Sequence, residues 1–198
     1  MRNKQIKRVT ATAFFIALVA LLGLTPLGLI PLGFINITIL CIPVITGTLL
    51  MGLPTGLLLG FAFGTVSMMS MLGMSMTPPS LLAGTLLGAS PVSAIVMCYA
   101  PRLLVPVVAH LVYTKLLPGK AAPAIAAAAA SLTNTVLYLG LMWAFYTMAG
   151  LDTGRVVAII LGTGLIGGGA EAVAAALLVP PIVAAVRKAN LFPKGETI

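Results

Sequence analysis

The sequence predicts an all-α membrane protein: a single integral membrane domain over residues 1–198, with six transmembrane helices and both termini on the cytoplasmic side. Hydrophobic residues make up 60% of the chain and charged residues 7%, whereas a soluble domain carries about 25% charge. No charged residue lies between Arg8 and Arg102. Such a chain cannot cover a water-exposed surface of its own size. This argues against a soluble enzyme and, despite the net charge of +8, against a nucleic-acid-binding face.

Three spans are expected in the first part of the chain, because each apolar run approaches the length that crosses a bilayer. The first covers about 9–24 and ends at Thr25-Pro26, before a hairpin rich in Gly and Pro. The second covers about 36–51, with Asn36 placed as its N-cap. Gly52 and Pro54 then predict a tight turn. The third covers about 55–72, and a looser stretch with several Ser, Thr and Pro residues is expected over 73–89.

Three further spans are expected at about 91–117, 121–149 and 153–186. Ser90-Pro91 is typical of a helix start, with Ser as the N-cap and Pro as the first helical residue. Asp152 is placed to cap the last span. Glycines at 162, 164 and 167–169 in that span serve either close helix packing or a substrate cavity, and the sequence leaves both open.

The basic residues predict the orientation, since cytoplasmic loops of membrane proteins are enriched in Lys and Arg. Six spans with a cytoplasmic N-terminus place nine basic residues on the cytoplasmic side: Arg2, Lys4, Lys7, Arg8, Lys115, Lys120, Arg187, Lys188 and Lys194. Arg155 alone falls outside, and Arg102 falls within a span. An even number of spans is therefore expected.

Polar residues at the depth of the membrane indicate the candidate site. Arg102, Asn134 and Glu171 fall in the middle of the last three predicted spans, and Thr133 is next to Asn134. A charge near the bilayer centre costs at least about 2.5–3.5 kcal/mol, so it faces the protein interior and finds a partner. Either Arg102 pairs with Glu171 and Asn134 completes the network, or Arg102 receives an anionic ligand through its planar fork of donors. Both readings stay open here.

Other residues bear on the kind of site that the chain could form. Tyr99 and Tyr138 are placed to line a cavity near the outer face. His110, the single histidine, is more typical of a satisfied interior side chain than of a proton carrier. The chain has no G-x-x-x-x-G-K-[ST] loop, so it does not hydrolyse ATP by that route. We expect no catalytic residue, metal or cofactor.

The order of several short motifs resembles the substrate-binding S components of energy-coupling-factor (ECF) transporters, bacterial vitamin importers. The motifs are IPLG over 30–33 with Asn36, IPVI over 42–45 with Gly47, GFAFG over 60–64, Ser90-Pro91, Pro101-Arg102, SLTNT over 131–135, Leu139-Gly140 and Glu171-Ala172. The pair of Pro-Arg and Ser-Leu-Thr-Asn-Thr is the most specific part. The likeness is greatest to the subgroup that includes pantothenate-type S components.

The resemblance implies a six-helix subunit in the bacterial cytoplasmic membrane that binds a vitamin near the outer face. It then topples in the membrane on a module of one membrane coupling protein and two cytoplasmic ATPases. The residues that would bind the vitamin are Arg102, Asn134, Glu171, Thr133, Tyr99, Tyr138 and Asn36. The family contacts its coupling protein through small residues spaced Ala-x-x-x-Ala on the first helix. Here Ala13 and Ala17 match that spacing, with Ala20 nearby.

The function expected from the sequence is therefore capture of a small vitamin or precursor, with pantothenate as the first choice. One rival is a stand-alone or proton-coupled carrier that uses Glu171 and His110. Another is a structural membrane protein without a ligand, in which Arg102 and Glu171 only pair with each other.

Overall fold

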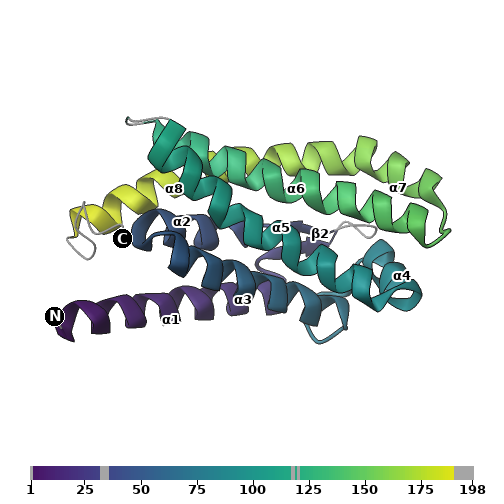
Figure 1. The fold of residues 1–198 in the computed structure, drawn as a ribbon, viewed down its shortest axis with the longest axis horizontal. Helices are drawn as coiled ribbons and strands as arrows, with labels where there is room; N and C mark the ends of the chain where they lie inside the picture. The colour runs from purple at the N-terminus through teal and green to yellow at the C-terminus, as the bar shows by residue number, and fades with distance from the viewer. Residues whose placement is uncertain (1, 32–35, 117–118, 120, 190–198) are drawn as a thin grey trace.

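The computed structural model describes residues 2–31, 36–116, 119 and 121–189, and these are nearly all helical. In this part of the chain, five helices are long and apolar enough to cross a membrane, and Cys41–Met51 forms a shorter apolar helix. The prediction of a helical, multi-pass membrane protein is confirmed at this level. The helices run roughly along the long axis of the molecule (Figure 1). The five are Gln5–Leu24, Leu53–Met71, Pro91–Lys115, Ala122–Met148 and Ile166–Lys188.

The second predicted span is not one helix. After α1 (Arg2–Leu24) the chain forms a short antiparallel hairpin, β1 (Leu29–Pro31) with β2 (Asn36–Thr38), and then α2 (Cys41–Met51). The expected cap at Asn36 is wrong, because Asn36 pairs with Pro31 in the hairpin and the N-cap of α2 is Leu40. Eleven residues of helix span about 16 Å at 1.5 Å per residue, roughly half of a 30 Å hydrocarbon core. Non-helical backbone at membrane depth occurs where it is buried in protein or lines a cavity.

The next segment contains an additional helix. Gly52 has φ 87°, which glycine adopts without strain, and α3 (Leu53–Met71) begins directly after it, as the predicted turn requires. The stretch expected to be loose over 73–89 contains α4 (Leu81–Ala89). Its start is fixed by Ser80, whose hydroxyl accepts a hydrogen bond from the Ala83 N–H at 3.4 Å.

The last part of the chain follows the predicted order, with two π-helical turns. The elements are α5 (Pro91–Leu111), η1 (Val112–Leu116), α6 (Ala122–Met148), α7 (Thr153–Ile159), η2 (Ile160–Gly164) and α8 (Leu165–Lys188). Both predicted helix starts are confirmed. The Ser90 hydroxyl accepts from the Ser93 N–H at 3.5 Å, and the Asp152 carboxylate accepts from the Gly154 N–H at 3.0 Å.

Glycines set the closest helix contacts, as small residues do in membrane bundles. On α3, Gly60 faces the backbone of α5, and a Cβ there would lie 2.6 Å from the Arg102 carbonyl oxygen. On α8, a Cβ at Gly168 would lie 2.4 Å from the Thr135 side chain of α6. These contacts press α3 and α8 against the helices that carry Arg102 and Asn134. The packing role left open for the glycines therefore applies to Gly168, which together with Gly164 and Gly167 also lines the cavity described below.

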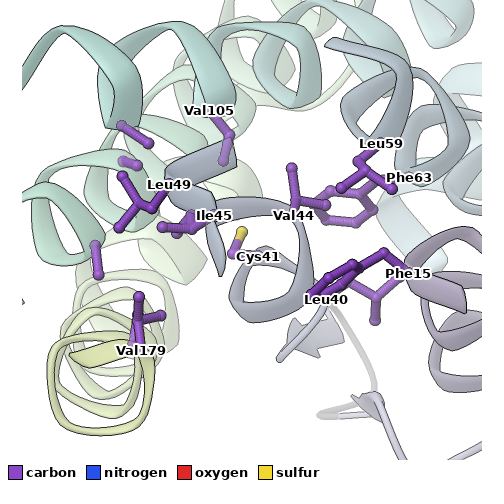
Figure 2. Packing of buried hydrophobic residues seen from close by; sticks show 14 of the residues in the cluster. Phe15, Leu40, Cys41, Val44, Ile45, Leu49, Leu59, Phe63, Val105 and Val179 are labelled. Carbon is purple, nitrogen blue, oxygen red and sulfur yellow. The ribbon is translucent and has the colours of Figure 1, made fainter. Parts of the chain in front are cut away.

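Buried apolar residues form two clusters at different levels of the bundle. One surrounds α2 and draws on α1, α3, α5, α6 and α8 (Figure 2), with Val44, Ile45 and Val105 each fully buried. The other joins α4 to α5 and α6, and includes Leu86 and Met142. Arg102 and Asn134 lie on α5 and α6, which contribute to both clusters, whereas Glu171 lies on α8, which contributes to the first.

We name the two ends of the bundle by their contents. The basic end is where α1 begins and α8 ends, both at the left of Figure 1, and the α4 end is the opposite one. At the basic end, Arg8 donates to the Met51 carbonyl oxygen at 3.2 Å, and Arg187 donates to that of Leu49 at 3.2 Å. Both arginines thus bind the C-terminal carbonyls of α2, where positive charge is favourable. Lys120 and Lys194 of the predicted basic set lie outside the described residues.

Candidate functional site

A cavity of about 80 Å³ lies between α3, α5, α6 and α8, toward the α4 end of the first cluster. This volume is several times the smallest space that holds one water, about 10–15 Å³. Its walls come from every helix that carries a predicted polar residue. The lining residues are Thr38, Phe63, Ser67, Ser70, Met71, Pro79, Ser80, Ala83, Cys98, Arg102, Asn134, Thr135, Tyr138, Leu139, Gly164, Gly167, Gly168 and Glu171.

Arg102 forms the positive wall of the cavity. It is 7% exposed, and its Nη1 donates to the Met97 carbonyl oxygen at 2.9 Å. The guanidinium carbon lies 4.6 Å from the centre of the Tyr138 ring and 5.3 Å from that of Phe63. Aromatic faces attract a cation without neutralising it. The Nε–H is buried without a hydrogen-bond partner.

Glu171 forms the negative wall and is held by two elements. Its Oε1 accepts from the backbone N–H of Thr38 in β2 at 2.6 Å, and its Oε2 accepts from the Thr135 hydroxyl on α6 at 3.4 Å. The short hairpin is thereby tied to α8 across the bundle. This contact fixes β2 against α8, where Thr38 and Glu171 both line the cavity.

Arg102 and Glu171 line the same cavity without touching each other. Among the described residues, no ion pair joins them, and the partners of Arg102 are a carbonyl and two rings. The direct pair that the sequence left open is therefore not formed. A buried charge without an opposite partner is costly, so this arrangement favours the alternative in which a ligand or water supplies the missing contacts.

Asn134 adds an acceptor beside the charges. Its side chain is 3% exposed, and its Oδ1 is buried without a partner. Buried polar atoms are rarely left unpaired in native proteins, and an exception indicates an unseen water or ligand. Arg102 Nε, a donor, and Asn134 Oδ1, an acceptor, are two such atoms on residues that line one cavity.

Three serines give the cavity a neutral polar side. Ser67 and Ser70 lie on α3 and Ser80 precedes α4. The Ser70 hydroxyl lies 3.1 Å from that of Ser75, and the Ser80 hydroxyl accepts from the Ala83 N–H. Hydroxyl, amide or carbonyl groups of a ligand would find partners on this side.

The cavity does not include every residue predicted for it. The Thr133 hydroxyl donates to the Ala129 carbonyl oxygen of its own helix at 2.8 Å, and Thr135 lines the cavity in its place. Tyr99 turns toward α3, where its hydroxyl lies 3.1 Å from that of Thr65. Gly64 makes room for this ring, because a Cβ there would lie 2.6 Å from it. The side chain of Asn36 lies outside the part that the structure describes.

Sequence reasoning missed Thr38, Thr135 and the three serines. Thr135 belongs to the motif over 131–135, and only the rotation of α6 decides which threonine faces the cavity. Ser67 and Ser70 are three residues apart, which places them on one helix face, and that spacing is a usable signal. Thr38 contributes through its backbone N–H, which carries no signature in the sequence. Cys98 is buried and also lines the cavity.

Comparison with models of protein families found none that matches the chain, and comparison with curated protein sequences found no match either. The site is therefore interpreted from its own chemistry. A guanidinium without an ion-pair partner among the described residues, a carboxylate on the same cavity, several hydroxyls and one side-chain amide match a small polar molecule that carries an anionic group and hydrogen-bonding groups.

Proposed function

We propose that this chain is the substrate-binding S component of an ECF-type importer. In this proposal it captures a small anionic vitamin or precursor, with pantothenate as the first candidate. The observation that carries the proposal is Arg102: a buried guanidinium on the wall of a cavity, with an unpartnered Nε and no ion pair among the described residues. A ligand carboxylate would accept two parallel hydrogen bonds from it.

Each wall of the cavity has a role in this proposal. Arg102 receives the carboxylate, and Asn134 hydrogen-bonds the group beside it. Glu171, fixed by Thr38 and Thr135, accepts from a ligand hydroxyl or amide N–H. The serines receive the remaining hydroxyl groups. Pantothenate offers one carboxylate, one amide and two hydroxyls, which is a matching set.

The carrier alternative receives less support from the packing. His110 is half-buried near the end of α5 and is not among the lining residues of the cavity. Between the cavity and the basic end lie the buried residues around α2, among them Ala126, Ala127 and Ala130. The described side chains in this region are mostly apolar and buried, so they give little support to a polar ligand on that path. Delivery by movement of the whole subunit, which the resemblance implies, does not require such a route.

The first helix supports the proposed contact with a coupling protein. Ala13 and Ala17 are exposed, Ala20 is half-buried, and only 17% of the α1 window is buried inside the molecule. In Figure 1, α1 lies along one side of the bundle. A partner helix could therefore approach closely along this line of small residues. The partners proposed are a membrane coupling protein and two cytoplasmic ATPases, with the basic end on the cytoplasmic side of a bacterial membrane.

Binding to the purified protein tests the proposal. Native mass spectrometry should find a retained small molecule, and calorimetry should detect pantothenate binding. Arg102→Ala should weaken binding about 30-fold or more, since truncating one side of a buried charge contact costs about 2 kcal/mol or more. Arg8→Ala, which removes an equal charge at the basic end, is the matched control. Full affinity after Arg102→Ala would overturn the proposal.

Uptake separates the importer from its rivals. Vesicles that contain this protein alone should not accumulate pantothenate, whereas vesicles that also contain the coupling protein and ATPases should do so when ATP is present. Uptake by the protein alone would favour the stand-alone carrier. Absence of any bound small molecule would favour the structural protein.

A further inference from the structure

Two prolines lie inside α5, at Pro101 and Pro106. A proline has no N–H, so the carbonyl four residues earlier in a helix loses its usual donor. In α5 these carbonyls belong to Met97 and Arg102. The two prolines are thus equivalent in their effect on the helix, but they release acceptors at different places.

The carbonyl that Pro101 releases is the one that Arg102 uses. Arg102 Nη1 donates to the Met97 oxygen at 2.9 Å, and Met97 itself is fully buried. An N–H on residue 101 would compete for that same oxygen. Proline directly before the arginine therefore leaves the Met97 oxygen to the guanidinium without a competing donor from the helix.

The remaining contacts of the guanidinium are also uncharged. Phe63 and Tyr138 present their rings to it at 5.3 and 4.6 Å, and its Nε is unpartnered. The guanidinium is held in place without a carboxylate, although Glu171 lines the same cavity. Its full positive charge remains available to an anion.

We propose that Pro101 is a positioning residue for anion binding: by releasing the Met97 carbonyl, it gives Arg102 an uncharged anchor and keeps it from pairing with Glu171. The inference rests on the proposed function in taking an anion as the ligand. With alanine at 101, the new N–H bonds to Met97 and the guanidinium loses its anchor. Glu171 is then the remaining opposite charge on the cavity, and attraction is strong where water is excluded.

Paired probes test the effect on binding: pantothenate and its neutral alcohol analogue, pantothenol, added to the full-length protein. Pro101→Ala should weaken pantothenate binding about tenfold or more, the range for a lost hydrogen bond to a charged group. Pantothenol binding should change less than about twofold, since that probe carries no charge for Arg102 to receive. Pro106→Ala is the matched control, because it restores a helix bond without touching the Met97 oxygen. An equal loss for both probes, or the same loss in both variants, would show a merely structural role and overturn the inference.

A second measurement needs no ligand. In protein labelled with ¹⁵N-arginine, the Nε–H signal of Arg102 can be assigned by its absence in Arg102→Lys. Pro101→Ala should shift this signal, and Glu171→Gln in the wild-type background should leave it in place because the two side chains are not paired. A shift on Glu171→Gln alone would overturn the inference even if Pro101→Ala did not fold. If wild-type protein bound neither probe, the ligand assignment would fail while these spectra still decided the role of Pro101.

Discussion

Both halves of this bundle bury polar atoms without hydrogen-bond partners, but the surroundings of those atoms differ. Around α2, near the basic end, Thr46 has a buried hydroxyl without a partner and lies among tightly packed apolar side chains. Around the cavity, Arg102 Nε and Asn134 Oδ1 are also buried without partners, but they border open space. An unpaired group costs stability in both places. In the cavity half a ligand or water has room to supply the missing hydrogen bonds, so the combination of unpaired atoms and open space indicates the site.

The largest effect is expected where α3 meets α5 between these halves. Gly60→Val places a Cβ 2.6 Å from the Arg102 carbonyl oxygen, which is backbone and cannot rotate away. We expect a loss of about 3 kcal/mol or more in the free energy of unfolding, the upper range for overpacking, together with loss of ligand binding. Thermal unfolding in detergent measures it. The control is Gly140→Val, where a Cβ meets nothing within 4 Å; an equal loss in both variants would contradict the packing argument.

The sequence predicted those features that depend on local chemistry or on charge. Ser90 and Asp152 cap helices where expected, because a capping side chain acts on its own neighbours. Arg102, Asn134 and Glu171 share one cavity, because charges in an apolar chain must turn inward.

The remaining features depend on three-dimensional context. The run over 36–51 is largely apolar, and such a run does not distinguish strand from helix by periodicity. In the structure it forms a hairpin and a helix, and Glu171, far along the chain, accepts a hydrogen bond from the Thr38 N–H of that hairpin. Likewise, Thr133 and Thr135 differ only in the direction that the rotation of α6 gives them. Whether Arg102 and Glu171 touch depends on Pro101, whose role appears only once the Met97 carbonyl is located.

The same substitution in each half sharpens the comparison. Ala127→Leu, in the filled half, should lower the free energy of unfolding by about 1–3 kcal/mol, because Ala127 is fully buried and has no space beside it. Ala83→Leu, on the cavity wall, should cost less than about 1 kcal/mol of stability, because the added volume enters open space. It should nevertheless weaken ligand binding by competing for that space. Chemical denaturation and calorimetry give both values; equal destabilisation would mean that the cavity wall is as tightly packed as the α2 cluster.

The smallest effect concerns the unpartnered polar atoms themselves. Ser131 and Asn134 lie three residues apart on α6, and each has a buried oxygen without a partner, but only Asn134 lines the cavity. Ser131→Ala should leave the stability of the empty protein unchanged or raise it by up to about 1 kcal/mol, since it removes an unpaired polar group, and it should not alter ligand affinity. Asn134→Ala should lower the stability of the empty protein by no more than about 1 kcal/mol yet weaken ligand binding severalfold. If both variants bound ligand like the wild type, Asn134 would be an unpaired group like Ser131, and the polar contacts of the ligand would have to come from Arg102, Glu171 and the serines.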